Sequence, residues 1–169
     1  MFSLRPLAGA ILTSALLTGY AVTPAAASVQ ESATVSQTAA AARPGNGKVL
    51  YDRVSGGEGV LKIKNGTAKD GVVTLVRGKT KAFSLYVRAK STASFKRVDD
   101  GNYTVYFTTG YRFSTSKRKF TKSASYQRFN DRLRFSTTAT QSTIWTLTLN
   151  PVKGGNARTS GVNPKDFPS

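Results

Sequence analysis

Apolar and polar residues alternate with a period of two in several separate stretches of the chain. The alternation is clearest at 83–88, 103–108, 132–135 and 145–149. The apolar positions in these stretches are Phe83, Leu85, Val87, Tyr103, Val105, Phe107, Leu133, Phe135, Trp145, Leu147 and Leu149. This period predicts strands with one buried and one solvated face. Aromatic and β-branched residues predict further strands at 49–53, 59–64, 72–77, 92–98, 118–121 and 124–129.

Turn residues separate these runs. The sequences NGT at 65–67, KDG at 69–71, RGK at 77–79 and DDGN at 99–102 supply the Asn, Asp and Gly that tight turns require. No stretch after the first 27 residues has the 3.6-residue period of an amphipathic helix, and we find no internal repeat. The pattern predicts an all-β fold, a single antiparallel β-sandwich at 47–153.

The first 46 residues have a different composition. Arg5 precedes an apolar run and small residues that end at Ala27, which is typical of a cleaved secretory signal peptide at 1–27. The alternative is an uncleaved anchor, although the apolar run is shorter than the roughly 20 residues that span a bilayer. Residues 28–46 lack aromatic side chains, so we expect a flexible, disordered linker. We therefore expect a secreted, extracellular protein with no transmembrane segment in the mature chain.

Charge and missing residue types narrow the range of functions. The chain has 25 basic and 8 acidic residues, and its formal charge of +17 becomes +16 when Arg5 leaves with the leader. Such an excess favours anionic partners, for example cell-wall phosphate polymers, acidic glycans, anionic lipid or nucleic acid. Cysteine and histidine are both absent, which excludes disulfides, the usual nucleophilic triads and most zinc sites. The few acidic residues are scattered, so we expect neither a metal site nor a cofactor.

Two motifs suggest enzyme chemistry and fail on context. Residues 71–80, GVVTLVRGKT, end like a nucleotide-binding loop, but six residues separate Gly71 from Gly78 where the motif requires four. Those six residues read as a strand, so we predict a β-hairpin and no nucleotide site. Ser114 and Lys117 match the S-x-x-K spacing of penicillin-recognising enzymes, but the partner motifs S-D-N and K-T-G are absent.

The stretch YRFSTSKRKFTKSASYQRFNDRLRF, residues 111–135, interleaves cations with aromatic rings and contains a single acidic residue, Asp131. Its basic residues are Arg112, Lys117, Arg118, Lys119, Lys122, Arg128, Arg132 and Arg134. If they fold side by side, they form a continuous positive surface that holds a polyanion by ion pairing and stacking. These eight residues are our candidate anion-binding site.

Three alternatives stay open on the sequence alone. The basic residues are equally compatible with an ordinary solvated face, because other cations are spread along the chain. The protein is otherwise a module or inhibitor that recognises another protein through loops or a sheet edge. An enzyme that uses only Ser, Lys, Tyr or Asp is the third reading, and the missing side chains make us favour a non-enzymatic binding module.

Several phrases also carry a family resemblance. The sequences LKIKNGTAKDGVVTLVRG, DGNYTVYFTTGYRF, YQRFNDRLRFST and WTLTLNPVKGGNARTSGVNPKDFP resemble those of uncharacterised secreted proteins of actinobacteria, over about 47–168. The resemblance implies an exported single domain and lends no activity. It also implies that the C-terminal tail, 154–169, packs on the domain, with Pro164, Phe167 and Pro168 covering a sheet edge. The strand–turn–strand run is similar, too, to transthyretin-like sandwiches of the carboxypeptidase-regulatory type.

Overall fold

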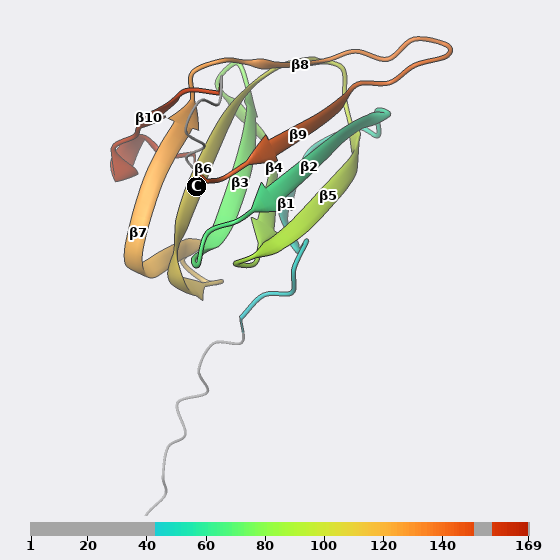
Figure 1. Ribbon diagram of the computed structural model, residues 1–169. Helices are drawn as coiled ribbons and strands as arrows, with labels where there is room; N and C mark the ends of the chain where they lie inside the picture. Colours follow the sequence, from blue (N-terminus) through green and yellow to red (C-terminus); the bar gives the residue numbers. More distant parts are fainter. Residues whose placement is uncertain (1–42, 151–156, 169) are drawn as a thin grey trace, which may run out of the picture. The chain divides into compact units, whose positions relative to one another are not determined.

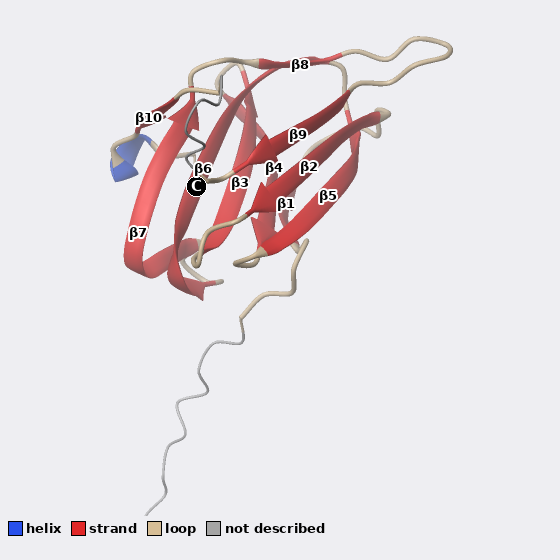
Figure 2. Ribbon diagram, viewed as in Figure 1, coloured by secondary structure: helices blue, strands red, loops and turns tan. Residues whose placement is uncertain are grey.

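The computed structural model describes residues 43–150 and 157–168, and these residues form strands and one short 3₁₀ turn (Figures 1 and 2). The elements are β1 (Val49–Asp52), β2 (Gly59–Asn65), β3 (Asp70–Arg77), β4 (Thr80–Val87), β5 (Ser91–Val98), β6 (Gly101–Ser114), β7 (Lys119–Phe129), β8 (Leu133–Phe135), β9 (Ile144–Thr148), β10 (Thr159–Gly161) and η1 (Pro164–Asp166). The predicted signal peptide, most of the predicted linker and residues 151–156 lie outside the described residues.

Two sheets of unequal width pack face to face. The larger sheet has the order β1-β4-β3-β6-β7-β10, with β8 also paired to β6, and the smaller sheet has the order β5-β2-β9. This arrangement confirms the predicted all-β sandwich. The pairing is antiparallel except between β2 and β9, which run parallel with Leu61 opposite Trp145. A parallel pair requires a long connection, and here the connection from β2 to β9 contains β3 to β8.

The core lies between the sheets and follows the predicted alternation. Leu61 and Ile63 of the smaller sheet are fully buried against Val73, Leu75 and other side chains of the larger one. Ten of the eleven apolar side chains that the alternation assigned to the core are buried. The exception is Trp145, which is 37% exposed. It lies on the edge strand β9, and its indole N–H donates to the carbonyl of Arg134 at the rim.

A second apolar cluster covers part of the outer face of the larger sheet. It consists of Val72, Tyr86, Phe113 and Phe120, with Leu50 packed against them. The β6–β7 hairpin supplies its two phenylalanines by curling over the sheet. Arg112, with a φ of 54°, marks the turn, because Tyr111 faces the inner side of the sheet and Phe113 the outer.

The strands predicted at 118–121 and 124–129 are one continuous strand, β7, so that prediction was wrong in detail. Residues 121–124 are all exposed. A stretch of strand that is exposed on both faces has no alternation of apolar and polar residues. Pairing with β6 keeps it extended all the same.

Both ends of the described chain are attached to the domain. Residues 43–46 fell within the predicted linker, but Pro44 is buried and the Asn46 side chain bonds to the backbone of Arg88 and Thr92. At the other end, β10 pairs with the edge of β7. Phe167 is buried against Tyr106 and Tyr126, on a face of the larger sheet and not at its edge. The edge of β7 is therefore covered by β10, and Phe167 covers part of the face of the sheet.

Candidate functional site

The eight basic residues singled out in the sequence are all exposed, and they lie on β6, β7, β8 and the turns between these strands. Arg134 lies on β8 opposite Asn102, near the beginning of β6. Lys119 lies opposite Ser114, at the end of β6. The residues therefore occur in several groups along these strands, and the β6–β7 hairpin, which curls over the sheet, sets where the groups lie in space.

The hairpin turn at 115–118 carries one of these groups. Arg118 lies beside Tyr51 and Lys81 on the outer face of the larger sheet. Burial, together with the positive charge of Arg118, lowers the pKa of Lys81. The ammonium group of Lys81 lies 4.3 Å from the centre of the Tyr51 ring. This group is cationic and small.

Acidic residues gather at the end of the sandwich that carries Arg132 and Arg134. This end holds the turns after β1, β3, β5 and β7. Five of the seven acidic residues of the described chain are at this end: Asp52, Glu58, Asp99, Asp100 and Asp131. Two of them anchor loops, since Asp99 accepts hydrogen bonds from the amides of Ser55 and Gly57, and Asp100 from the amide and hydroxyl of Thr137. The arginines on β8 thus have acidic neighbours on the same end of the domain.

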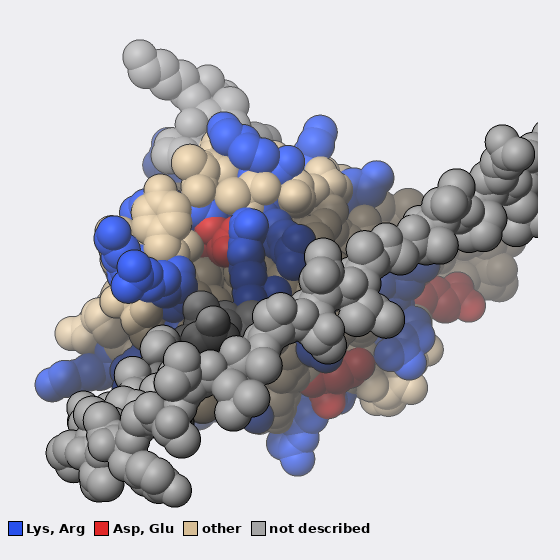
Figure 3. All heavy atoms as spheres, turned by 90° about the horizontal axis from the view of Figure 1, so that it is seen from below, with Lys and Arg blue, Asp and Glu red and all other residues tan. Residues whose placement is uncertain are grey.

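The opposite end of the sandwich is basic. It holds the β2–β3 and β4–β5 turns, the residues before β1 and the middle of the β6–β7 hairpin, because antiparallel strands place alternate turns at the same end. We call the following six residues the basic end: Lys64, Lys69, Arg88, Lys90, Arg112 and Lys122. Figure 3 looks onto this end and shows lysine and arginine side chains over much of its described surface. Only Arg112 and Lys122 of the eight predicted residues belong to it.

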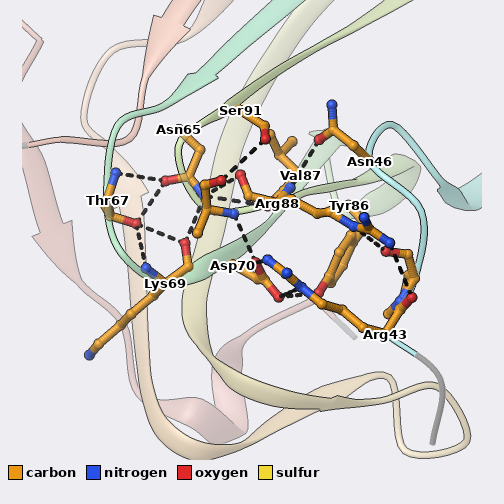
Figure 4. A network of polar contacts seen from close by, with 12 residues as sticks. Arg43, Asn46, Asn65, Thr67, Lys69, Asp70, Tyr86, Val87, Arg88 and Ser91 are labelled. Atoms are coloured by element: carbon orange, nitrogen blue, oxygen red, sulfur yellow. Dashed lines mark hydrogen bonds and ion pairs between the residues drawn. The ribbon is translucent and has the colours of Figure 1, made fainter.

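Asn65 fixes the two turns that carry most of the basic end (Figure 4). This side chain is fully buried, and its amide donates to the carbonyls of Lys69 and Arg88 at 2.8 and 3.1 Å. Its carbonyl oxygen accepts from the backbone and hydroxyl of Thr67. One amide side chain therefore bridges two loops that are far apart in sequence. Buried amides that satisfy donor and acceptor alike hold a geometry firmly.

Lysine side chains join these turns to one another and to the hairpin. The Lys90 ammonium donates to the carbonyl of Gly66 at 2.6 Å, and the Lys69 ammonium to the carbonyl of Ser123 at 3.1 Å. Lys69 also lies 5.8 Å from the centre of the Tyr111 ring. These bonds fix the positions of the ammonium groups without neutralising their charge.

Asp70 is the one acidic residue of the described chain that lies among these turns, and it is already paired. Its carboxylate accepts hydrogen bonds from the Arg43 guanidinium, the Tyr86 hydroxyl and the Ala89 amide (Figure 4). Burial by itself would raise the pKa of Asp70, but these three bonds outweigh it, and the pKa lies below its ordinary value. The same burial, reinforced by the Asp70 carboxylate, raises the pKa of Tyr86. Asp70 therefore compensates Arg43 and leaves the basic end uncompensated.

A cleft opens beside the smaller sheet, and one of its mouths is at the basic end. The larger sheet continues through β6, β7 and β10, whereas the smaller sheet stops at β9. The cleft between them has a volume of about 680 Å³, and we call it the β9 cleft. Its floor includes Phe107, Phe129 and Leu147, and hydroxyl and amide side chains make up much of the rest. Lys69 and Tyr111 lie at the mouth.

The motifs that suggested enzyme chemistry have no support in the geometry. Residues 71–80 run from β3 through a tight turn at Gly78 into β4, as the hairpin reading predicted, and no helix follows. Ser114 and Lys117 lie in the β6–β7 turn, where the serine hydroxyl accepts from the lysine amide. Within 43–150 and 157–168, no three acidic side chains are close enough to hold a metal ion. The same residues include no helix of the length and apolarity that a membrane crossing requires.

Sequence reasoning treated Lys64, Lys69, Arg88 and Lys90 as diffuse charge. The available signal was topological: the turns at 65–70 and 88–91 are separated by one hairpin and therefore lie at the same end of an antiparallel sheet. The β9 cleft left no signal of this kind, since it arises from the unequal widths of the sheets. No protein-family model, curated protein or solved structure matches the chain, so a function for it rests on the geometry alone.

Proposed function

We propose that this protein is a secreted, non-enzymatic binding module for an anionic polymer of the cell exterior, and that the basic end is its binding surface. One observation carries the proposal. Six cationic side chains from β2, β6, β7 and the β2–β3 and β4–β5 turns lie at one end of the sandwich, while five of the seven described acidic residues lie at the other. The nearest acidic residue, Asp70, already binds Arg43.

The fixed backbone of the basic end supports the same function. Like charges placed together repel one another, and an anionic ligand removes that repulsion when it binds. Hydrogen bonds of Asn65 and Lys90 hold the turns in place before any ligand arrives. A site that is already ordered loses less conformational entropy on binding. A regular polyanion suits the surface better than a single small anion, because the cations come from several strands and turns.

A salt titration of binding to heparin and to a teichoic acid tests the proposal. If five or six anionic groups are contacted, the logarithm of the affinity should fall with the logarithm of salt concentration with a slope of about −3.5 to −5.5. Binding that does not change with salt would contradict a charge-driven surface. Absence of binding to both polymers at low salt would reject the function altogether.

A further inference from the structure

The edge strands of the two sheets differ in how well they are protected against pairing with another strand. Native proteins protect edges with charges, bulges, prolines or short length. β5 carries Lys96 and Arg97 and has a register shift at its end, β1 has four residues and a shift, and β8 and β10 have three residues each. β9 is also short, at five residues, but within the described chain it carries no charge, proline or bulge: its sequence is IWTLT, and its register against β2 is continuous.

Among the described strands, none pairs with the side of β9 that lies away from β2, and this side faces the β9 cleft. The carbonyl of Thr143 accepts from Val60, and the amide of Leu149 donates to Lys64. Residues of a parallel strand alternate in the direction of their backbone hydrogen bonds, so the odd-numbered residues of β9 bond to β2. The amide and carbonyl groups of Thr146 and Thr148 therefore point away from β2, and both residues line the cleft.

The floor of the cleft is the rim of the sandwich core, where Phe107, Phe129 and Leu147 are already 4%, 5% and 7% exposed. Phe107 and Phe129 lie on the inner face of the larger sheet, and Leu147 lies opposite them on β9. In a complete sandwich, another strand of the smaller sheet would cover this face at about 4.8 Å from β9. The volume of about 680 Å³ is sufficient for an extended segment and falls within the usual size of binding pockets.

Three large apolar side chains remain exposed in the described chain, and one of them lines this opening. They are Tyr111, Ile144 and Trp145, with exposed fractions of 40%, 65% and 37%. Tyr111 lines the cleft, and the other two begin β9. A strand added to β9 would lie beside Ile144 on one face of the sheet and beside Trp145 on the other.

We propose that the β9 cleft binds an extended segment of a partner protein, which pairs with β9 as a fourth strand of the smaller sheet. Backbone hydrogen bonds to Thr146 and Thr148 supply affinity, and alternate side chains of the segment pack on Phe107 and Phe129. Among the described lining residues, Lys69 is charged and none is acidic. The segment therefore alternates apolar with uncharged polar residues and carries an acidic residue at the end near Lys69.

The probe is a panel of synthetic peptides of about eight residues, in which Val or Ile alternates with Thr and one terminus is Asp. In the free protein, the amides of Thr146 and Thr148 should exchange with solvent much faster than those of Trp145 and Leu147. Peptide binding should slow the exchange of the two threonine amides. N-methylation of the peptide amides that face β9 should abolish binding. N-methylation of the alternate amides, which face away from β9, should not.

Thr146→Pro removes the outward N–H without breaking a bond to β2, so we expect at least about tenfold weaker peptide binding, equivalent to about 1.4 kcal/mol. Thr146→Val keeps the backbone edge and should bind within about twofold of the unchanged protein. Thermal unfolding of both variants shows that the domain is folded, and heparin binding tests the basic end separately. The proposal is overturned if no peptide binds, if both methylation phases act alike, or if the threonine amides stay unprotected.

Discussion

The Tyr86 hydroxyl donates a hydrogen bond to the carboxylate of Asp70, from β4 to the beginning of β3 and beneath the N-terminal residues of the described chain. Both residues are buried, and the ring of Tyr86 packs on Phe113 and Phe120. The bond thus joins the second apolar cluster to the ion pair that attaches Arg43. It links three segments that are distant in sequence.

Tyr86→Phe should therefore destabilise the domain. The change keeps the ring and removes a hydrogen bond to a buried carboxylate, and bonds to charged groups contribute about 1.5–3 kcal/mol. Urea unfolding at neutral pH measures the loss. Tyr106→Phe is the matched control, because no hydrogen bond of the Tyr106 hydroxyl to another described residue is present, and it should change stability by less than about 0.5 kcal/mol. Equal effects of the two changes would show that the Asp70 bond adds nothing.

Stability should fall in acid. Hydrogen bonds lower the pKa of Asp70 and of Asp99 in the folded protein, although burial opposes them. The unfolded carboxylates take up protons near pH 4, while the folded ones still resist. The contribution of both groups is therefore complete above about pH 5 and is lost as pH falls below about 4. Urea unfolding at several pH values should show this decline, and Asp99→Asn should make it shallower. A midpoint that stays constant between pH 5 and 3 would contradict the assignment.

Gly110→Ala tests the curl of the β6–β7 hairpin. A Cβ at this position would lie 2.6 Å from the Cβ and 2.7 Å from the Cγ of Phe120, closer than real contacts allow. The ring must move out of the second cluster, and overpacking of this kind costs about 1–3 kcal/mol. Gly161→Ala meets no atom within 4 Å and should be nearly neutral. Thermal unfolding of both variants decides whether the cluster is as tight as these distances require.

The contribution of the basic end can be separated from overall charge by two double variants. Lys64→Glu with Lys122→Glu changes two of its residues, neither of which donates a side-chain hydrogen bond to another described residue. Arg132→Glu with Arg134→Glu makes the same change in charge at the opposite end. Only the first should weaken heparin binding strongly, and it should reduce the salt slope by about 1.5–2. Equal losses would mean that net charge, and not the arrangement, controls binding.

The sequence predicted most strands because burial on one face imposes alternation, as at Phe83 and Leu85. The prediction failed where a strand is exposed on both faces or lies at the edge of a sheet. Residues 121–124 are wet on both faces, and Trp145 lies on an edge, so the period of two is lost in one place and misleading in the other. Parallel pairing of β9 with β2 leaves no local signal, because strand order depends on contacts between distant residues.

The candidate site was less predictable than the fold. Density of charge along the chain pointed to 112–134, but the basic end includes only Arg112 and Lys122 of those eight basic residues. Lys69 and Arg88 meet through the carbonyls that Asn65 binds, although 18 positions separate them in the sequence. Linear clustering of charge is thus a weak guide in an antiparallel sheet, and the placement of turns is a better one.

The parallel pairing of β2 with β9 also bears on how the protein forms. The hairpins of the larger sheet join residues close in sequence, so each can close soon after it is synthesised. Val60, by contrast, cannot pair with Ile144 until more than 80 further residues have been synthesised. Closure of so long a loop is slow, and contacts of high sequence separation set the folding rate of β proteins. During biosynthesis, β2 therefore waits with one side unpaired until nearly the whole domain has emerged.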